Sequence, residues 1–229
     1  MIKNDKYYVN SFMQQLQVIY DRLLLEYGPQ HWWPADFPFE VIIGAILTQS
    51  AAWKNVEKAI NNLRSADVLD IKKLQDMPLE ELARLIRPSG YYNAKAKKLK
   101  AFVVWLDENC DNDLEVLFKK DINSLREKLL SIHGIGEETA DSIILYAAGK
   151  PIFVIDAYTK RIISRVGLLP YDAGYNTYQR LFMENIKPDV YMFNEYHALL
   201  VCLGKFICRK VPLCAECCLK DICQNHLKS

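Results

Sequence analysis

The chain has 229 residues, of which 51% are hydrophobic and 25% charged, and its formal net charge is +1. A chain of this length and composition can bury a large core in one or two globular domains, which excludes a disordered or low-complexity protein. The first residues are polar and no apolar run approaches membrane-spanning length, so we expect a cytoplasmic protein without signal peptide or membrane span. The near-zero charge excludes attraction to nucleic acid by a global field, and any such binding must use local patches and backbone amides.

Apolar residues recur at helical spacing along most of the chain. These stretches predict helices that include Phe12, Trp53, Leu79, Leu99, Tyr158 and Leu199. The only strand-like run, residues 152–155, is too isolated to form a sheet. Turns rich in glycine and proline separate the helical stretches. The pattern therefore predicts an all-α fold.

The first of these turns, "YGPQHWWPADFP", is a proline-rich loop that carries Trp32, Trp33 and Pro34. Trp53 lies further on, on the apolar stripe of the next helix, and its spacing alone favours a place in the core. The two tryptophans of the loop are better candidates for a pocket.

Four lysines follow the turn "RPSGYYN", at positions 95, 97, 98 and 100. Such a cluster is either a local patch that meets a polyanion or the solvated face of a helix, and the sequence leaves both readings open.

A glycine-framed turn, Gly134-Ile135-Gly136, lies within "HGIGEETADSI" and opens a helix. Glycines permit a positive φ or a close backbone approach, and the amides and dipole of a helix N-terminus favour an anion. A plain link between two helices is the alternative. About twenty residues further on, "FVIDAYTKRI" places Asp156 at the start of another helix, where it can act as an N-cap.

The cysteines are concentrated near the C-terminus. Cys208, Cys214, Cys217 and Cys223 are separated by five, two and five residues, and Cys218 lies among them. In a cytosolic chain such clustering indicates a metal or cluster site instead of disulfides. The spacing alone suits a [4Fe–4S] cluster or a tetrahedral zinc ion equally.

Taken together, these segments resemble the endonuclease III superfamily of helix–hairpin–helix DNA glycosylases. The segments "FEVIIGAILTQSAAWKNV", "SGYYNAKAKKL", "IHGIGEETADSI" and "FVIDAYTKRI" match that family in order, and the cysteines follow, so the resemblance extends from about residue 32 to 223. It implies a two-lobed all-α fold with the active cleft between the lobes. Residues 40–153 would form a helical barrel domain with the hairpin. Residues 1–39 and 154–229 would form the second lobe, with the cluster loop at 208–223.

The resemblance also implies roles for two acidic residues. Asp156 would be the catalytic carboxylate. Bifunctional members carry a lysine nucleophile where this chain has Glu138, and a carboxylate cannot form a Schiff base. We therefore expect hydrolysis without AP-lyase activity. Glu138 would assist the water or the base, or would only complement the helix dipole.

The glutamate and several aromatic residues resemble the 3-methyladenine DNA glycosylase III branch. This implies a base pocket formed by Trp32, Trp33, Pro34, Trp53 and Lys205. Electron-rich rings attract a cation, and a methylated purine is cationic where a normal purine is not.

The expected DNA contacts lie in three places. Residues Gly134, Ile135 and Gly136 would hold the backbone, together with Lys95. Gln49 and Ser50 occupy the turn where the family presents a side chain that fills the gap left by a flipped base, and we favour Gln49 for that role.

We therefore expect a monomeric, monofunctional DNA glycosylase of base excision repair. It would flip alkylated purines such as 3-methyladenine out of double-stranded DNA and hydrolyse their N-glycosidic bond. The alternatives are a glycosylase for uracil, mispaired thymine or an oxidised base, a non-catalytic module that binds damaged DNA, and an electron-transfer protein.

The resemblance also favours a [4Fe–4S] cluster over zinc, with Cys208, Cys214, Cys217 and Cys223 as the ligands. The family commonly places six residues in the first interval, where this chain has five. Cys218 would be a free thiol.

Overall fold

The computed structural model describes residues 11–227, which are helical and contain no β-strand. The all-α prediction is therefore confirmed for this part of the chain, and the polar segment 1–10 lies outside it. None of the helices between residues 11 and 227 has the length and apolar character needed to cross a membrane.

The chain divides into two compact units. Residues 33–152 form the first, which we call the hairpin unit, and residues 1–32 with 153–229 form the second, the cysteine unit. The sequence-based ranges are 40–153 for the first part and 1–39 with 154–229 for the second. The difference at the first boundary matters because Trp32 and Trp33, which are neighbours in the proline-rich loop, belong to different units.

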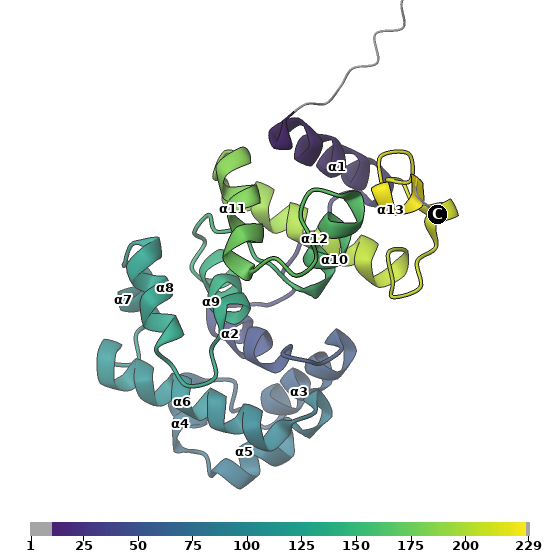
Figure 1. The fold of residues 1–229 in the computed structure, drawn as a ribbon. Coiled ribbons are helices and arrows are strands. Elements are labelled where there is room, and N and C mark those ends of the chain that lie inside the picture. Colours follow the sequence, from purple (N-terminus) through teal and green to yellow (C-terminus); the bar gives the residue numbers. More distant parts are fainter. Residues whose placement is uncertain (1–10, 228–229) are drawn as a thin grey trace, which may run out of the picture. The chain divides into compact units, whose positions relative to one another are not determined.

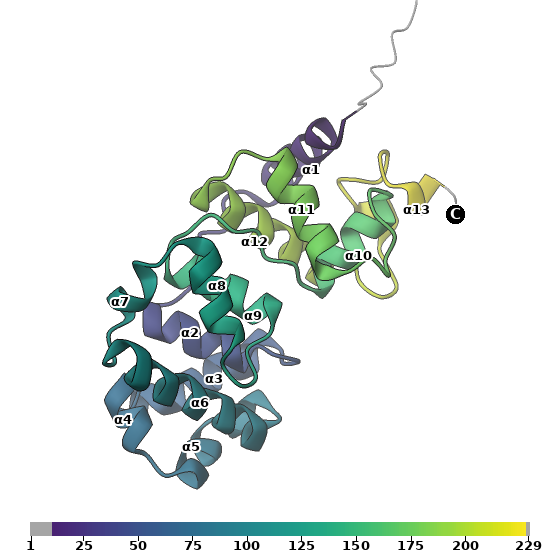
Figure 2. The same ribbon diagram turned by 60° about the vertical axis from the view of Figure 1, so that its left-hand side comes forward.

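The hairpin unit is built around one buried helix, α2 (Pro38–Leu47), in which every residue from Phe39 to Leu47 is buried. A helix that is apolar on all sides needs neighbours on all sides, and α2 packs against α3, α6, α9 and the π-helical turn η2. Figure 2 shows this arrangement. The elements of the unit after α2 are α3 (Trp53–Ser65), α4 (Ile71–Asp76), α5 (Leu79–Leu85), η1 (Arg87–Ser89), α6 (Tyr92–Cys110), α7 (Leu114–Phe118), α8 (Ile122–Leu130), α9 (Glu137–Ser142) and η2 (Ile143–Ala147).

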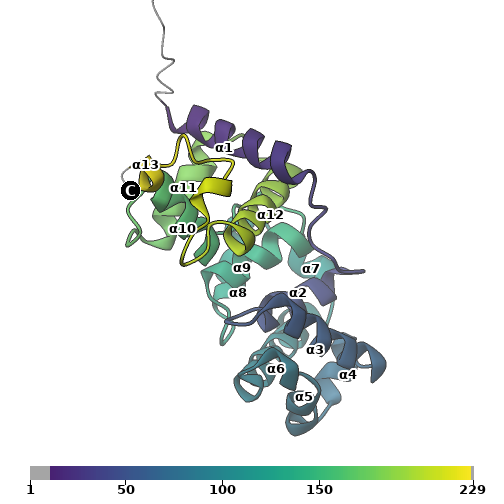
Figure 3. The same cartoon turned by 90° about the vertical axis from the view of Figure 1, so that its right-hand side faces the viewer.

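The cysteine unit is organised by α12 (Val190–Phe206), which lies against both α1 (Phe12–Tyr27) and α10 (Ala157–Val166) (Figures 1 and 3). Gly204 permits the close approach of α12 to α10, because a Cβ atom there would lie 2.5 Å from the Tyr158 ring. The remaining elements are α11 (Tyr175–Asn185), η3 (Cys214–Glu216) and α13 (Gln224–Leu227). Phe153 stacks on Phe182 at 3.8 Å between ring centroids and anchors the start of this segment in the core.

The lysine cluster at the start of α6 points largely into the protein. Lys95 is 2% exposed, and its ammonium group donates hydrogen bonds to the carbonyl oxygens of Leu47 and Ser89, each at 2.7 Å. Lys100 likewise donates to the carbonyls of Leu74, Gln75 and Met77 at the end of α4. The structure therefore corrects the expected DNA contact of Lys95: its charge satisfies carbonyl groups at a helix C-terminus and cannot reach a phosphate.

Burial also predicts how Lys95 affects stability. Burial, with a smaller contribution from the charge of Lys98, lowers the pKa of Lys95 from 10.5 to about 8. Below about pH 8 the amine is charged in both the folded and the unfolded chain, so its contribution is constant. Between about pH 8 and 10.5 the unfolded chain binds more protons than the folded chain, and stability must rise with pH.

We therefore expect the free energy of unfolding of the wild type to increase, relative to that of Lys95→Met, as the pH is raised from about 8 to about 10. Urea denaturation at a series of fixed pH values measures this difference. Lys97→Met is the matched control, because Lys97 lies on the same helix but is exposed, and its difference from the wild type should stay flat. A flat difference for Lys95→Met as well would show that Lys95 keeps an ordinary pKa.

Candidate functional site

The predicted hairpin is formed by α8, a turn at residues 131–136 and α9. Gly134 has φ +84°, and a Cβ atom there would lie 2.3 Å from Cγ of Lys98, so glycine is required both for the conformation and for the space. Gly136 has an ordinary φ of −95°, and a Cβ atom there would meet nothing within 4 Å. The turn is thus closed on the Gly134 side and open on the Gly136 side, where α9 begins without a side-chain cap.

Ile135 contributes to the hairpin from the inside. Its side chain is 5% exposed, and its backbone N–H donates to the carbonyl of Ile132 at 3.1 Å. It therefore anchors the tip of the turn in the core, and the open approach to the turn lies at Gly136 and the first residues of α9.

A buried ion pair holds the two helices of the hairpin together. Arg126 of α8 donates to both carboxylate oxygens of Asp141 on α9, at 2.7 and 3.2 Å, and lies 3.5 Å from Glu137. Asp141 is fully buried. A bidentate pair of this kind fixes the angle between the helices as well as their contact. The sequence analysis did not find it, because only the folded hairpin brings these side chains together.

Glu138 lies in the first turn of α9 and is exposed. Its neighbour Glu137 pairs with Arg126, so the two acids of this turn have different surroundings. Both carboxylates lie at the N-terminal end of α9, where a negative charge complements the helix dipole.

Four exposed non-glycine residues of the hairpin unit have backbone in the left-handed region: Ser50, Asp67, Tyr91 and Asp111. Ser50, between α2 and α3, has φ +53°, and Tyr91, just before α6, has φ +46° and is 75% exposed. Backbone of this kind is costly for residues other than glycine and is concentrated at functional sites. The sequence analysis named Ser50 but missed Tyr91, for which the adjacent Gly90 was the available sequence feature. Gln49, beside Ser50, is turned inward and bonds to the hairpin.

Asp156 is the N-cap of α10, as the sequence predicts: its Oδ1 accepts a hydrogen bond from the N–H of Thr159 at 2.7 Å. The connector that leads to it is held by α11, since Tyr175 accepts from the N–H of Ile155 and Gln179 donates to the carbonyl of Phe153. The strand-like run 152–155 is therefore an extended segment tied to a helix. The Asp156 carboxylate is 12% exposed and held in one orientation.

His197 of α12 faces the same carboxylate and was not found from the sequence. Its Nε2 lies 3.8 Å from Oδ2 of Asp156, and the side chain is buried. Burial lowers the pKa of His197, although the charge of Asp156 opposes this shift. A neutral imidazole beside Asp156 at neutral pH is the result.

Three aromatic rings of the hairpin unit form a cluster. Trp33 meets Trp53 edge-on at 5.2 Å between ring centroids and meets Tyr146 at the same separation with a tilt of 48°. All three are half-buried, and Gly44 makes room for Trp33, because a Cβ atom there would lie 3.0 Å from the indole. Trp53 thus lies in an aromatic cluster instead of the closed core. Tyr146 is an addition to the predicted set, and it comes from the π-helical turn η2.

Three other residues were predicted for the base pocket. Trp32 is half-buried and belongs to the cysteine unit, and Pro34 is exposed. Lys205 is exposed near the end of α12, with its ammonium group 5.0 Å from the centroid of the Phe206 ring.

The four predicted cysteine ligands are all partly exposed and lie in the cysteine unit. Arg165 of α10 connects the first and the last of them: its guanidinium donates to Sγ of Cys208, and its carbonyl accepts from Cys223, each at 3.3 Å. The same guanidinium donates to the carbonyls of Arg209 and Lys210. Cys218 forms a hydrogen bond with Cys217 that lowers the pKa of Cys217.

As a donor set, four thiols suit a soft metal or an iron–sulfur cluster, because thiolates are the ligands that such groups prefer. Within residues 11–227, the side chains do not converge on a ready-made metal site. The chemistry of the ligands therefore fits the predicted group, and the side-chain positions shown do not by themselves form its coordination sphere.

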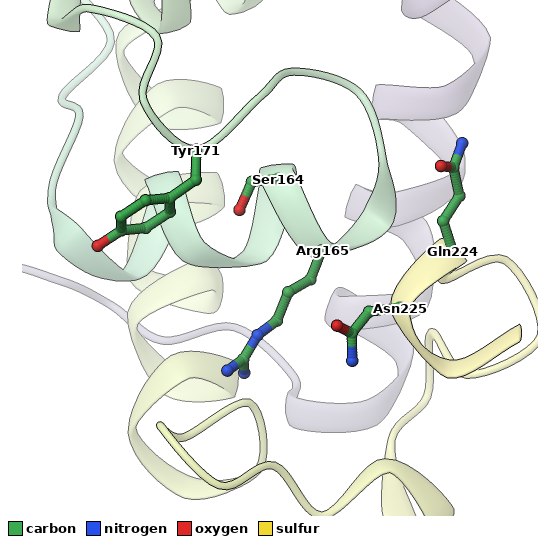
Figure 4. A pocket seen from close by; sticks show the side chains of 5 residues that line it. All are labelled: Ser164, Arg165, Tyr171, Gln224 and Asn225. Carbon is green, nitrogen blue, oxygen red and sulfur yellow. The ribbon is translucent and has the colours of Figure 1, made fainter. Parts of the chain in front are cut away.

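An open pocket in the cysteine unit adjoins the cysteine segment. It is lined by Ser164 and Arg165 of α10, Tyr171, and Gln224 and Asn225 of α13 (Figure 4). Arg165 is the residue that bonds to Cys208 and Cys223, and Gln224 directly follows Cys223. None of the predicted site residues lines the pocket itself.

Comparison with known proteins places these features in a family context. Residues 43–188 match the HhH-GPD superfamily base excision DNA repair proteins. A chain assigned as a DNA repair glycosylase in Methanocaldococcus jannaschii is 47% identical over 215 residues, which cover 93% of this chain and 97% of the relative. Endonuclease III of Sulfolobus acidocaldarius is 27% identical and 82% of each chain is covered.

Solved structures of DNA glycosylases also match this chain. The H. pylori 3-methyladenine DNA glycosylase MagIII, bound to 1,N6-ethenoadenine, matches with a TM-score of 0.73 and 27% identity, covering 85% of this chain and 97% of that one. An endonuclease III–DNA complex has a TM-score of 0.82 and 22% identity, covering 94% and 97%, and shows the shared fold. These matches confirm the helix–hairpin–helix glycosylase fold expected from the sequence.

Proposed function

This chain belongs to the HhH-GPD superfamily of base excision DNA repair proteins, and from that premise we propose that it is a monofunctional DNA glycosylase for alkylated purines such as 3-methyladenine. It acts as a monomer on double-stranded DNA. The observation that carries the proposal is the rigidly capped carboxylate of Asp156. Separately, the second helix of the hairpin begins with a glutamate, Glu138, at the position where the resemblance places the lysine of bifunctional members.

The reaction is hydrolysis of the bond between the base and C1′ of the sugar. As that bond breaks, its electron pair leaves with the base and positive charge develops on the sugar. Asp156 stabilises this charge and accepts a proton from the water that adds to C1′. Its cap bond to Thr159 suits this task, because a carboxylate already held in place needs no reorganisation as the charge develops.

Glu138 explains why the product is an intact abasic strand. An AP-lyase needs an amine that forms a Schiff base with the sugar, and a carboxylate cannot supply one. Glu138 is exposed at the N-terminus of α9, where its carboxylate is accessible to water. Its carboxylate assists in ordering water.

The aromatic cluster of Trp33, Trp53 and Tyr146 supports recognition of a cationic base. Methylated purines carry a positive charge that normal purines lack, and the faces of electron-rich rings attract it. Such bases also leave without prior protonation, so their release needs no strong general acid. Trp32, Pro34 and Lys205 remain predicted pocket residues on the resemblance alone.

The hairpin supports binding of the DNA backbone. The open side at Gly136 and the uncapped start of α9 offer amides and a helix dipole to a phosphate. The exposed side chains of Ser50 and Tyr91 are suited to contact bases near the flipped nucleotide, the first by hydrogen bonding and the second by stacking.

We also infer that the four spaced cysteines bind a [4Fe–4S] cluster. Its ligands would be Cys208, Cys214, Cys217 and Cys223, and Arg165 would donate to the thiolate of Cys208. Such a cluster would cross-link the C-terminal loop. The loop also carries Arg209 and Lys210, which are exposed and suited to phosphate contact.

The decisive experiment is base release from methylated duplex DNA. We expect the wild type to release 3-methyladenine and to leave the abasic strand uncut, and Asp156→Asn to be slower by at least about a hundredfold, because the general base is lost. Asp189→Asn is a matched control: Asp189 caps α12 by an equal 2.7 Å bond to the N–H of Met192, and this variant should keep full activity.

Equal release by the wild type and Asp156→Asn would remove Asp156 from the mechanism. Duplexes with uracil, mispaired thymine or an oxidised base test the other specificities in the same assay. Binding without release from any of these substrates would identify a non-catalytic DNA-binding module.

The aromatic cluster can be tested separately from folding. We expect Trp53→Leu and Tyr146→Leu each to lower kcat/KM for methylated DNA by roughly tenfold, since a cation–π contact is lost, whereas Tyr146→Phe retains the ring and most of the activity. Trp105→Leu is the control, because Trp105 is half-buried on α6 and outside the cluster. If urea midpoints fall in parallel with activity, the rings serve the core and not the base.

The cluster proposal is tested by composition. The purified protein should contain iron and acid-labile sulfide in equal amounts and absorb broadly in the visible range. Cys214→Ser should lose both, whereas Cys218→Ser should keep them because Cys218 is not a proposed ligand. Stoichiometric zinc without visible absorption would contradict the proposal.

A further inference from the structure

Gln49 connects three segments that are far apart in the sequence. It lies in the loop between α2 and α3, and its side-chain amide donates to the carbonyl of Gly134 at 3.0 Å and to Oγ1 of Thr139 at 2.9 Å. Its amide oxygen accepts from the ammonium group of Lys98 on α6. One side chain therefore joins the loop, the hairpin and α6 within the hairpin unit.

The hydrogen-bonding capacity of the Gln49 amide is used by these contacts. A carboxamide has two N–H donors and one carbonyl acceptor, and here both donors serve the hairpin while the oxygen takes the lysine. Glutamate would lack the donors and leucine would lack all three groups. The contact set is thus specific for an amide side chain.

The position of these bonds in the hairpin is equally specific. Gly134 is the residue with φ +84°, packed against the stem of Lys98, and Thr139 lies in the first turn of α9. Gln49 holds the turn from both ends, at the strained glycine and at the start of the helix. Without it, the carbonyl of Gly134 would lose a partner beside a lysine that packs on the same residue.

We propose that Gln49 is a positioning residue for the hairpin, and that in the DNA-free protein it acts as an internal strut. This differs from the role in which it fills the gap left by a flipped base. One amide cannot both hold the hairpin and enter the DNA, so insertion would break the three hydrogen bonds and release the turn. The neighbouring side chain of Ser50, in the middle of this loop, is exposed.

The proposal has a test that does not depend on catalysis. Hydrogen exchange of the full chain reports the opening of individual segments. We expect amides in residues 134–140 to exchange about tenfold faster in Gln49→Glu and Gln49→Leu, since two hydrogen bonds to the hairpin are lost in each. Amides of α10 serve as the internal reference and should be unchanged.

Two further variants sharpen the interpretation. Ser50→Ala is the matched control on the same loop and should leave exchange of the hairpin unchanged. Lys98→Met removes the donor to Gln49 but keeps the aliphatic stem against Gly134, so a smaller acceleration is expected. Wild-type exchange rates in both Gln49 variants would overturn the proposal.

The prediction for DNA binding rests on the proposed function. Binding to undamaged duplex distinguishes a Gln49 that shapes the hairpin from a Gln49 that fills the gap left by a flipped base. A strut that shapes the hairpin predicts weaker binding of Gln49→Leu to undamaged duplex, where no base is flipped and no gap exists. Unchanged binding there, with activity lost only on damaged duplex, would favour the gap-filling role and contradict the strut. If the wild type failed to bind DNA at all, the proposed function would fail, while the exchange measurement would still decide the role of Gln49.

Discussion

Backbone groups at helix ends are the constraint on which the rest of this structure depends. A chain folded into many short helices has many N–H and C=O groups without partners in their own helix, and each needs a bond from elsewhere when it is buried. Side chains supply several of these bonds among the described residues. Lys95 meets the end of α2, Lys100 the end of α4, and Asp156 the start of α10.

The need to satisfy backbone groups at helix ends also explains why some candidate site residues have a structural role. Asp156 caps a helix and presents its carboxylate in one orientation, and Arg165 holds the loop after Cys208 while it donates to the sulfur of that cysteine. A group that satisfies a helix end is positioned by the fold itself. A reactive side chain at a helix end therefore needs few additional contacts to fix its orientation.

The fold and part of the site were predictable from the sequence because they leave local patterns. Helical periodicity identified the helices, and residue type with position identified Asp156 as a cap. The glycines at 134 and 136 were both candidates for a positive φ, and Gly134 adopts one. The tryptophans at 33 and 53 were named from the resemblance, and the structure brings them together.

What could not be predicted depends on partners distant in sequence. A lysine close to three others in sequence indicates an exposed position. Nothing in the sequence shows that Lys95 donates hydrogen bonds to the carbonyls of Leu47 and Ser89. The pairing of Arg126 with Asp141 and the contact of Tyr146 with Trp33 exist only in the folded unit. Apolar residues in the sequence are matched to the repeat of a regular α-helix, so their spacing does not reveal the π-helical turn η2.

The π-helical turn has a consequence for the aromatic cluster. A π-helical turn arises when a helix accommodates one additional residue, and everything beyond it is rotated relative to the helix before it. Tyr146 lies in this turn and meets Trp33. Loss of a single codon between Ile143 and Ala147 would restore a regular helix and turn a different side chain toward the tryptophan. One deletion would therefore change the lining of the aromatic cluster without altering any of its other members.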